Sequence, residues 1–541
     1  RRDMLVQNFL ETSASRRPDK VALICGDRRL TYSEIDQKAN SLALYLRSLG
    51  IKRQDRVAVF LENSVESVIS LFGILKADAI FLMLNSSIKT SKLAYILKDC
   101  SVKAAIAHRT KQKIVEEAAL HASELQHILW VGKDNTIKQE PLPRTFVSSH
   151  AFGLTISLQL SAMSPGNSCN IDLDLATIIY TSGSTGDPKG VMLTHLNMVS
   201  AATSITTYLE NREDDIVINV LPLSFDYGLY QVLMTFKFGG TLVLEKSFTY
   251  PYQILQKMVS EKVTGFPGVP TIFAILLGLK YPEKFDFSHL RYISNTAAAL
   301  PPPYIEKLRK LFPHVRLYSM YGLTECKRVS YLPPEELERR PLSVGKGMPN
   351  EEVWIVDDQG KELGPNEVGE LVVRGSNVMR GYWGLPEETA KALKPGKYPG
   401  EVVLYSGDFF KKDEEGYLYF VGRKDDMIKS KGERISPKEI EQCLCSLDGI
   451  AETAVFGVPD EILGQAIVAY IRCHDNITLQ KKTVIKHCRE NLEDFMTPKY
   501  IEFINAFPKT STNKIDKLTL KEMFASHIAA AAPSPTDSMT Q

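Results

Sequence analysis

Residues 181–190 read Thr181-Ser182-Gly183-Ser184-Thr185-Gly186-Asp187-Pro188-Lys189-Gly190 and directly follow an apolar run that ends at Tyr180. The glycines let the backbone approach a polyanion closely, and the N–H groups and hydroxyls supply hydrogen-bond donors. Lys189 adds a point charge that suits phosphate. The spacing of a Walker-type loop and its Lys-Ser/Thr ending are both missing. We interpret this segment as a loop that binds nucleotide phosphates; the alternative is a flexible surface loop.

Short β-branched runs alternate with helix-period stretches on both sides of this loop. Residues 56–60, 104–107 and 176–180 have the pattern of strands, and residues 64–75 have that of a helix. Such alternation predicts α/β layers with largely parallel sheets. We therefore expect an α/β fold for the larger part of the chain.

The pattern changes twice towards the C-terminus. Between residues 353 and 420, short strands are separated by turns, which predicts a small β subdomain. After residue 425, helical and strand-like segments alternate again, as expected for a separate α+β domain. The predicted organisation is a large N-terminal domain of layered α/β sheets plus the β subdomain, a small mobile C-terminal domain and a disordered tail. Their bounds are residues 1–424, 425–528 and 529–541.

Composition and charge argue against a nucleic-acid-binding protein and against a membrane protein. The 541 residues include 65 Lys and Arg against 64 Asp and Glu, so the formal net charge is +1. Such a balance gives no reason to expect nucleic acid or an anionic membrane as a partner. Eight cysteines without a CxxC pair suggest a reduced, cytoplasmic protein. No apolar run approaches the roughly 20 residues of a membrane span.

The loop at residues 181–190 and five further segments together resemble the motifs of a known family. The five segments are residues 295–300, Tyr321-Gly322-Leu323-Thr324-Glu325, Tyr405-Ser406-Gly407-Asp408, Gly422-Arg423-Lys424-Asp425 continuing to Lys431-Gly432, and Pro508 to Lys514. In this order they resemble the motifs of the AMP-forming adenylating superfamily, which contains acyl-CoA ligases, luciferases and the adenylation domains of peptide synthetases. The resemblance implies ATP and Mg²⁺ as cofactors and a carboxylic acid as substrate.

The resemblance also implies which residues bind the nucleotide. Tyr321 offers a face on which adenine can stack, Asp408 can accept the ribose hydroxyls, and Arg423 can reach ribose or phosphate. Their alternatives are a core aromatic residue and surface turn residues. The full expected set is Thr181, Ser182, Gly183, Ser184, Thr185, Gly186, Lys189, Ala297, Tyr321, Gly322, Asp408 and Arg423.

We expect three residues to have catalytic roles. Glu325 supplies a hard oxygen for Mg²⁺, and Thr324 supplies a hydroxyl towards phosphate, although a helix cap is its alternative role. Joining a carboxylate to the α-phosphate brings two anions together, so a cation at their junction lowers the barrier. The resemblance assigns that cation to Lys514 and a hinge between the two half-reactions to Asp425.

The segment Leu221-Pro222-Leu223-Ser224-Phe225-Asp226-Tyr227-Gly228 bears on the acid. Acyl-CoA ligases commonly have His at the position of Phe225, whereas amino-acid-activating relatives have Phe-Asp, with the Asp pairing the α-ammonium. Asp226 therefore favours an amino acid, since a buried charge needs a partner. Its alternative role is to cap the helix that begins near Tyr227.

Residues that the resemblance places around the acid are Phe225, Asp226, Tyr230, Pro267, Ile293, Asn295, Met320, Arg328 and Val329. This wall is mostly apolar, and Arg328 fits it only with an outward-pointing side chain. Similarity to stand-alone ligases makes L-proline the preferred substrate and the phosphopantetheine thiol of a separate carrier protein the acceptor, as in natural-product assembly. An acyl- or aryl-CoA ligase that uses free CoA remains open, as does a regulatory protein without turnover.

Overall fold

The computed structural model describes residues 4–132, 148–151, 164–181, 188–296, 300–430, 433–460, 463–475, 477–492, 496–510 and 515–531. By internal contacts the chain divides into two units. The first comprises residues 1–354, 372–406 and 413–419, and the second comprises residues 355–371, 407–412 and 420–541. The predicted boundary at Asp425 stays a prediction.

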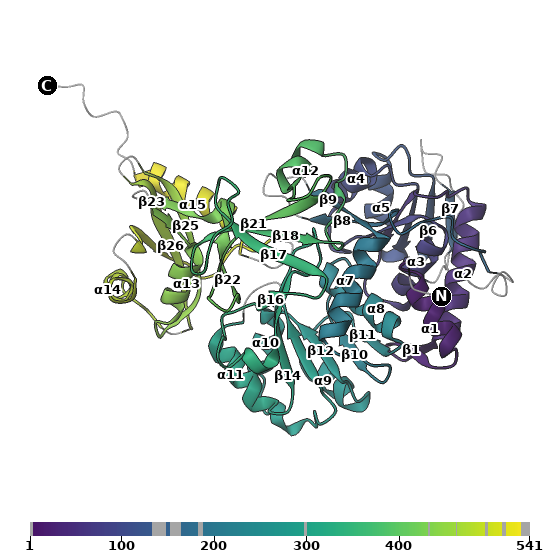
Figure 1. The fold of residues 1–541 in the computed structure, drawn as a ribbon, viewed down its shortest axis with the longest axis horizontal. Helices are drawn as coiled ribbons and strands as arrows, with labels where there is room; N and C mark the ends of the chain where they lie inside the picture. The colour runs from purple at the N-terminus through teal and green to yellow at the C-terminus, as the bar shows by residue number, and fades with distance from the viewer. Residues whose placement is uncertain are drawn as a thin grey trace. The chain divides into compact units, whose positions relative to one another are not determined.

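One sheet of the first unit has the strand order β16-β15-β14-β13-β12-β10-β11-β1-β2. The strands from β14 to β1 are parallel, and β2, β15 and β16 are antiparallel to their neighbours. Figure 1 shows α9, α10 and α11 along one side of this sheet and α7 and α8 on the other. Its strands are β1 (Val21–Cys25), β2 (Arg28–Thr31), β10 (Ile216–Asn219), β11 (Thr241–Leu244), β12 (Gly265–Gly268), β13 (Tyr292–Asn295), β14 (Arg316–Tyr321), β15 (Ser330–Leu332) and β16 (Lys346–Gly347).

A second sheet of this unit has the order β19-β9-β8-β4-β3-β5-β6-β7. The strands from β8 to β7 are parallel, and β9 and β19 are antiparallel. The predicted strands at 56–60, 104–107 and 176–180 are confirmed as β3, β5 and β8. The strands are β3 (Arg56–Phe60), β4 (Ile80–Met83), β5 (Ala104–His108), β6 (His127–Val131), β7 (Ser148–Ala151), β8 (Leu175–Thr181), β9 (Lys189–Thr194) and β19 (Gly381–Tyr382).

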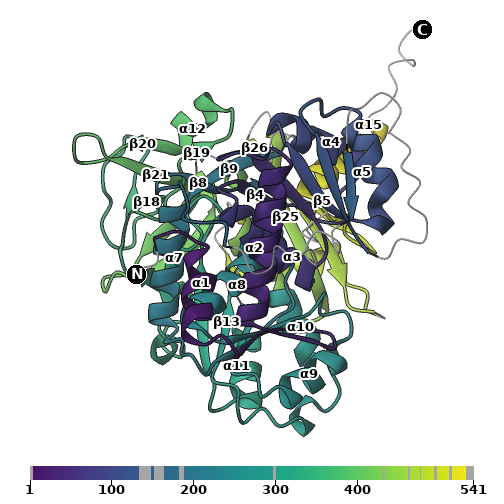
Figure 2. The ribbon, with the colours of Figure 1, turned by 90° about the vertical axis from the view of Figure 1, so that its right-hand side faces the viewer.

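Helices cover both sheets, and two of them are buried on nearly every side. Almost every residue of α3 and of α8 is buried, as expected for helices whose residues are apolar all round. Figure 2 shows α1, α2, α3 and α8 grouped together. The helices of the first unit are α1 (Asn8–Arg16), α2 (Tyr32–Ser48), α3 (Val65–Lys76), α4 (Thr90–Asp99), α5 (Gln112–Ala119), α7 (His195–Tyr208), α8 (Asp226–Phe238), α9 (Pro251–Ser260), α10 (Pro270–Leu277), α11 (Pro302–Leu311) and α12 (Pro386–Ala392).

The predicted β region is confirmed as a sheet with the order β17-β18-β21-β20, to which β22 adds by pairing with β21. Its strands are β17 (Glu351–Val356), β18 (Gly369–Gly375), β20 (Leu393–Pro395), β21 (Val402–Lys412) and β22 (Leu418–Arg423). Strands β17, β18, β21 and β22 each contribute residues to both units.

The C-terminal part of the second unit is an α+β sandwich with the sheet order β24-β23-β26-β25 and β27 paired to β26. One face of the sheet packs against α13 and α14, and the other packs against α15. The elements are β23 (Ile428–Ser430), β24 (Glu433–Ile435), α13 (Pro437–Cys445), β25 (Ile450–Asp460), β26 (Gly464–Cys473), α14 (Lys481–Asn491), β27 (Tyr500–Phe503) and α15 (Lys517–Ala531). Residues 529–531 of the predicted tail thus continue α15, and residues 532–541 lie outside the described part.

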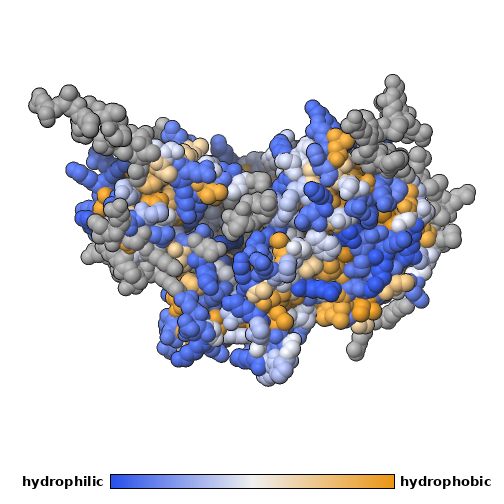
Figure 3. Space-filling view, turned by 90° about the horizontal axis from the view of Figure 1, so that it is seen from above, coloured by the Kyte–Doolittle hydropathy of each residue, from blue (hydrophilic) through white to orange (hydrophobic). Residues whose placement is uncertain are grey.

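No described helix is long and apolar enough to cross a bilayer. On the face shown in Figure 3, hydrophilic side chains predominate, with hydrophobic ones in small groups between them. All eight cysteines are free thiols.

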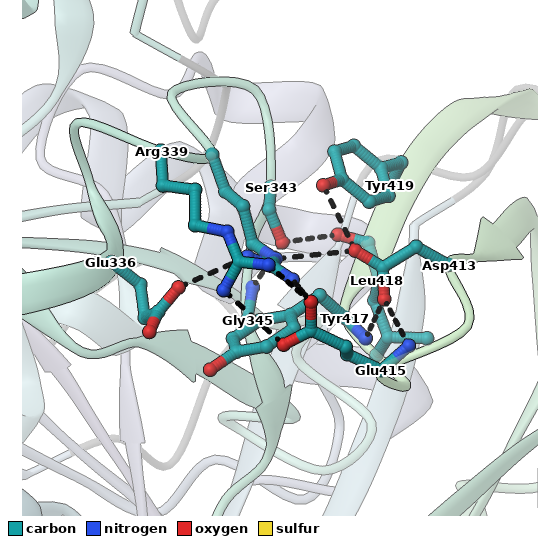
Figure 4. A network of polar contacts seen from close by, with 10 residues as sticks. Glu336, Arg339, Ser343, Gly345, Asp413, Glu415, Tyr417, Leu418 and Tyr419 are labelled. Carbon is teal, nitrogen blue, oxygen red and sulfur yellow. Dashed lines mark hydrogen bonds and ion pairs between the residues drawn. The ribbon is translucent and has the colours of Figure 1, made fainter.

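A polar network fixes the loop that follows β15. Arg340 forms ion pairs with Glu336 at 3.0 Å, Asp413 at 3.2 Å and Glu415 at 2.6 Å, and its guanidinium lies 4.1 Å from the centre of the Tyr417 ring (Figure 4). Three carboxylates around one guanidinium hold the loop more firmly than a single exposed pair would.

Gly345, at the end of this loop, passes very close to β15. Its φ is +84°, and a Cβ built there would lie 1.7 Å from the carbonyl oxygen of Tyr331. Gly416 has the same φ of +84°, but the nearest atom to its Cβ would be 3.9 Å away. Substitution at Gly416 therefore measures the cost of the left-handed backbone alone, and substitution at Gly345 measures that cost together with the cost of steric overlap.

We predict that Gly345→Ala lowers the free energy of unfolding by about 3 kcal/mol or more, because strain and overlap add. Gly416→Ala is the matched control and costs about 1 kcal/mol, from the left-handed backbone alone. Thermal unfolding followed by circular dichroism measures both. Equal shifts of the two midpoints would show that β15 moves aside without cost.

Candidate functional site

The carboxyl ends of four parallel strands meet at one edge of the first sheet. Asn295 ends β13, Tyr321 ends β14, and Asp226 begins the helix that follows β10. In open α/β sheets this edge is where ligands bind. The structure thus brings together, within the first unit, residues that the sequence placed around adenine and around the acid.

The chain after β14 forms a tight loop that starts at the surface and ends in the core. Residues 321–325 are half-buried, and residues 326–330 are buried. A Cβ on Gly322 would lie 2.4 Å from the carbonyl oxygen of Lys327, so only glycine fits. The N–H of Val329 donates to the carbonyl of Tyr321 at 3.0 Å and closes the loop.

Glu325 is positioned by a residue that the sequence did not single out. The hydroxyl of Tyr382 donates to Glu325 Oε1 at 2.8 Å. Among the described residues, no three His, Cys, Asp or Glu side chains lie close enough together to hold a metal ion by themselves. One carboxylate nevertheless suits Mg²⁺, which keeps several waters and takes further oxygens from nucleotide phosphates. Glu325 therefore fits the metal-binding role expected of it.

Lys189 and Thr181 flank the predicted phosphate loop on paired strands, Thr181 at the end of β8 and Lys189 at the start of β9. The Lys189 ammonium donates to Glu388 of α12 at 2.5 Å and lies 5.5 Å from the centre of the Tyr382 ring. Hydrogen bonds from Lys189 and Lys391 lower the pKa of Glu388 to about 2. The lysine expected to meet phosphate is thus held by a carboxylate.

Asp408 and Arg423 lie near each other in the second unit. Arg423 Nε is 4.0 Å from Asp408 Oδ1, and the arginine is largely exposed. Buried Glu370 accepts hydrogen bonds from the N–H of Gly407 at 3.1 Å and from Lys424 at 2.8 Å. Glu370 thereby fixes the turn that presents Asp408, a role that the sequence did not indicate.

Asp226 does not cap a helix. It is the first residue of α8, whose N-cap is Phe225, and no side chain caps that end. Asp226 Oδ2 instead lies 3.8 Å from the Lys327 ammonium, and the two side chains are only 10% and 2% exposed. A buried cation of the chain itself therefore faces the carboxylate that the sequence assigned to a substrate ammonium.

Lys327 occupies an unusual place for a lysine. Its φ is +68°, and its ammonium lies 4.6 Å from the centre of the Tyr230 ring and 5.1 Å from that of Tyr227. Burial lowers the pKa of Lys327 to about 7, although Asp226 acts in the opposite direction. The two aromatic rings and the carboxylate replace water around the charge.

The other residues expected around the acid are buried as well. Asn295, Met320 and Tyr230 lie in the core. Arg328 does not reach solvent: it is 1% exposed, and its Nη1 donates to Thr296 Oγ1 at 2.5 Å. Its guanidinium lies 5.3 Å from the centre of the Tyr227 ring, which shields it from water.

Several predicted residues lie outside the described part of the chain. They are Ser182, Gly183, Ser184, Thr185, Gly186, Ala297, Lys514 and the side chain of Asp425. Lys327, Glu370, Tyr382 and Glu388 are the residues that sequence reasoning missed. Only Lys327, two residues after a motif, could have been found from the sequence, because the others reach the site through tertiary contacts.

Comparison with known proteins identifies the family. The model of the AMP-binding enzyme family matches residues 10–383, and that of the AMP-binding enzyme C-terminal domain matches residues 439–514. A long-chain-fatty-acid–CoA ligase of Bacillus subtilis is 30% identical, covering 96% of this chain and 94% of its own. Surfactin synthase subunit 2 of the same organism is 28% identical over 97% of this chain and 14% of its own.

A solved structure extends the likeness to the whole fold. The anthranilate CoA ligase AuaEII in complex with anthranoyl-AMP has a TM-score of 0.85 and 28% identity, and the match covers 98% of each chain. The chain belongs to the AMP-binding enzyme family and is an adenylate-forming acid ligase that uses ATP with Mg²⁺.

Proposed function

We propose that this ligase activates an acid without an α-amine and transfers it to free CoA. The observation that carries the proposal is the buried pair of Asp226 and Lys327, whose charged atoms are 3.8 Å apart. A buried carboxylate needs one compensating charge, and here the chain supplies it.

An α-ammonium would be poorly placed beside this pair. Lys327 already faces Asp226, and Arg328 lies in the same buried loop. A substrate ammonium would add a third cation near a single carboxylate, at a place where water does not screen the repulsion. An acid without an amine avoids that cost.

The proposed reaction has two steps. A carboxylate oxygen of the acid bonds to the α-phosphorus of ATP, and the bond from that phosphorus to the bridging oxygen breaks and releases pyrophosphate. A thiolate sulfur then bonds to the acyl carbon, and AMP leaves. In the first step Glu325 would hold Mg²⁺, which would offset charge on the phosphates, and Thr324 and Lys189 would donate to phosphate; Lys514 is the proposed cation for the junction of carboxylate and phosphate. Asp425 is the proposed hinge between the steps.

Free CoA is the proposed acceptor for two reasons. The Bacillus subtilis relative and the anthranilate ligase are both named as CoA ligases, and each aligns over nearly all of this chain. Surfactin synthase subunit 2 also aligns over 97% of this chain, but the match covers only 14% of its own length.

A second candidate keeps the amino acid, with L-proline as the predicted substrate and a separate carrier protein as acceptor. Two observations favour it: Asp226 is a carboxylate at the position where the resemblance expects an ammonium partner, and a surfactin synthase subunit is among the relatives. In this candidate, the substrate ammonium would have to displace Lys327 from Asp226.

Pyrophosphate exchange into ATP separates the two candidates. The chain is assayed with each proteinogenic amino acid and with fatty, aromatic and dicarboxylic acids. We expect exchange with an acid that lacks an amine, and conversion of that acid to its CoA thioester when free CoA is added. Liquid chromatography of the thioester measures the second step.

The opposite result would be exchange with proline or another amino acid that Asp226→Asn abolishes, with thioester formed only on a phosphopantetheinylated carrier protein. That outcome would establish the second candidate. It would also show that the substrate ammonium replaces Lys327 beside Asp226.

The Tyr382–Glu325 hydrogen bond generates a prediction about Mg²⁺. Without the hydroxyl, the Glu325 carboxylate loses the partner that orients it, and such losses weaken metal binding by about tenfold or more. We therefore predict that Tyr382→Phe raises the Mg²⁺ concentration for half-maximal pyrophosphate exchange by about tenfold.

Tyr419→Phe is the matched control, because Tyr419 also donates to a carboxylate, that of Asp413, at 3.2 Å. It should leave the Mg²⁺ dependence unchanged. If both variants shift the dependence equally, or neither does, Tyr382 does not position the metal ligand.

A further inference from the structure

Two buried donors in the loop after β14 lack acceptors. The Lys327 ammonium is buried, and no described residue accepts a hydrogen bond from it. Its nearest carboxylate oxygen, on Asp226, is 3.8 Å away, which is beyond hydrogen-bonding distance. The Nε of Arg328 likewise has no acceptor among the described residues. Leaving such donors unsatisfied in the core is costly unless a ligand supplies the acceptors.

The loop that carries these donors is firmly held. Asn377 donates to the carbonyl oxygens of Cys326 at 2.8 Å and of Arg328 at 3.1 Å. Lys327, between them, keeps a left-handed backbone with φ of +68° and packs against Gly322. Such a conformation costs free energy for a residue other than glycine, so the surrounding contacts maintain it.

Like charges lie close together in this cluster. Lys327 and Arg328 are both basic, and Asp226 is the carboxylate that faces Lys327, at 3.8 Å. Burial lowers the pKa of Lys327 to about 7, and the neighbouring Arg328 acts in the same direction. A further negative charge beside the two buried donors would favour the charged form of Lys327.

A second anionic group on the substrate meets both requirements. It supplies acceptors to Nζ and Nε, and its negative charge favours the charged form of Lys327. A carboxylate has two oxygens and accepts from both donor types, which a hydroxyl or keto group does less strongly. We propose that the acid carries a second carboxylate, which binds Lys327 and Arg328 while the first carboxylate is adenylated; this rests on the proposed function.

Matched acids test the assignment. Pyrophosphate exchange is measured with malonate, succinate, glutarate and phthalate, each paired with the monocarboxylic acid that has a methyl group in place of one carboxylate: propionate, butyrate, pentanoate and 2-methylbenzoate. We expect one dicarboxylic acid to exceed its partner in kcat/KM by at least about 100-fold. In Lys327→Met this preference should fall to about tenfold or less.

Two controls keep the result interpretable. Lys246→Met removes an exposed lysine whose ion-pair partner among the described residues is exposed Glu62, at 3.3 Å, and it should keep the preference unchanged. Lys327→Met alone leaves the Asp226 carboxylate buried without a partner, and this charge could itself repel a dicarboxylic acid. The double variant Asp226→Asn with Lys327→Met removes both charges and measures the preference without that repulsion. Thermal unfolding confirms that each variant is folded.

The outcomes are distinct. A dicarboxylic preference that Lys327→Met removes supports the assignment. Equal or better use of the monocarboxylic partners, or exchange with none of the four dicarboxylic acids, overturns it and leaves the proposed function in place if another amine-free acid is activated. Exchange with amino acids alone overturns the proposed function as well.

Discussion

The parallel alignment of β10, β12, β13 and β14 is the constraint on which the site depends. Parallel strands need crossover helices, so their carboxyl ends all meet at the same edge of the sheet. The chain leaves that edge at Asn295, at Tyr321 and just before Asp226. Asp226 and Lys327, about a hundred positions apart in the sequence, thus lie in one cluster.

Within this arrangement, charge compensation decides which acid fits. Asp226 meets Lys327 inside the protein, and Arg328 is buried instead of reaching solvent. A buried ion pair adds little stability by itself, but removing one partner is costly. The cluster is therefore selective: it disfavours a further cation and favours an anion. Glu325 and Lys189 are likewise each held by a polar residue from elsewhere in the first unit, and in the second unit Glu370 holds Gly407, the residue before Asp408.

Much of the fold followed from sequence pattern, because alternation of apolar residues directly reflects burial on sheets and helices. β3, α3, β5 and β8 lie within a few residues of their predicted positions. The motifs also named the loops that form the site. What the sequence could not give were contacts across the fold, such as Tyr382 with Glu325 and Glu370 with Gly407. Asp226 was predicted to be a counter-ion, and Lys327 stands two residues after a motif, but their pairing depends on a left-handed backbone at Lys327 that no propensity indicates.

The central claim is that Asp226 needs no substrate ammonium, and non-hydrolysable adenylates test it most directly. The sulfamoyl adenosine analogues of prolyl-AMP and cyclopentanecarbonyl-AMP differ by an amine in place of a methylene. Isothermal titration calorimetry gives the Kd of each. We predict that the amine-free analogue binds at least about tenfold more tightly. Tighter binding of the prolyl analogue, with the advantage lost in Asp226→Asn, would contradict the account.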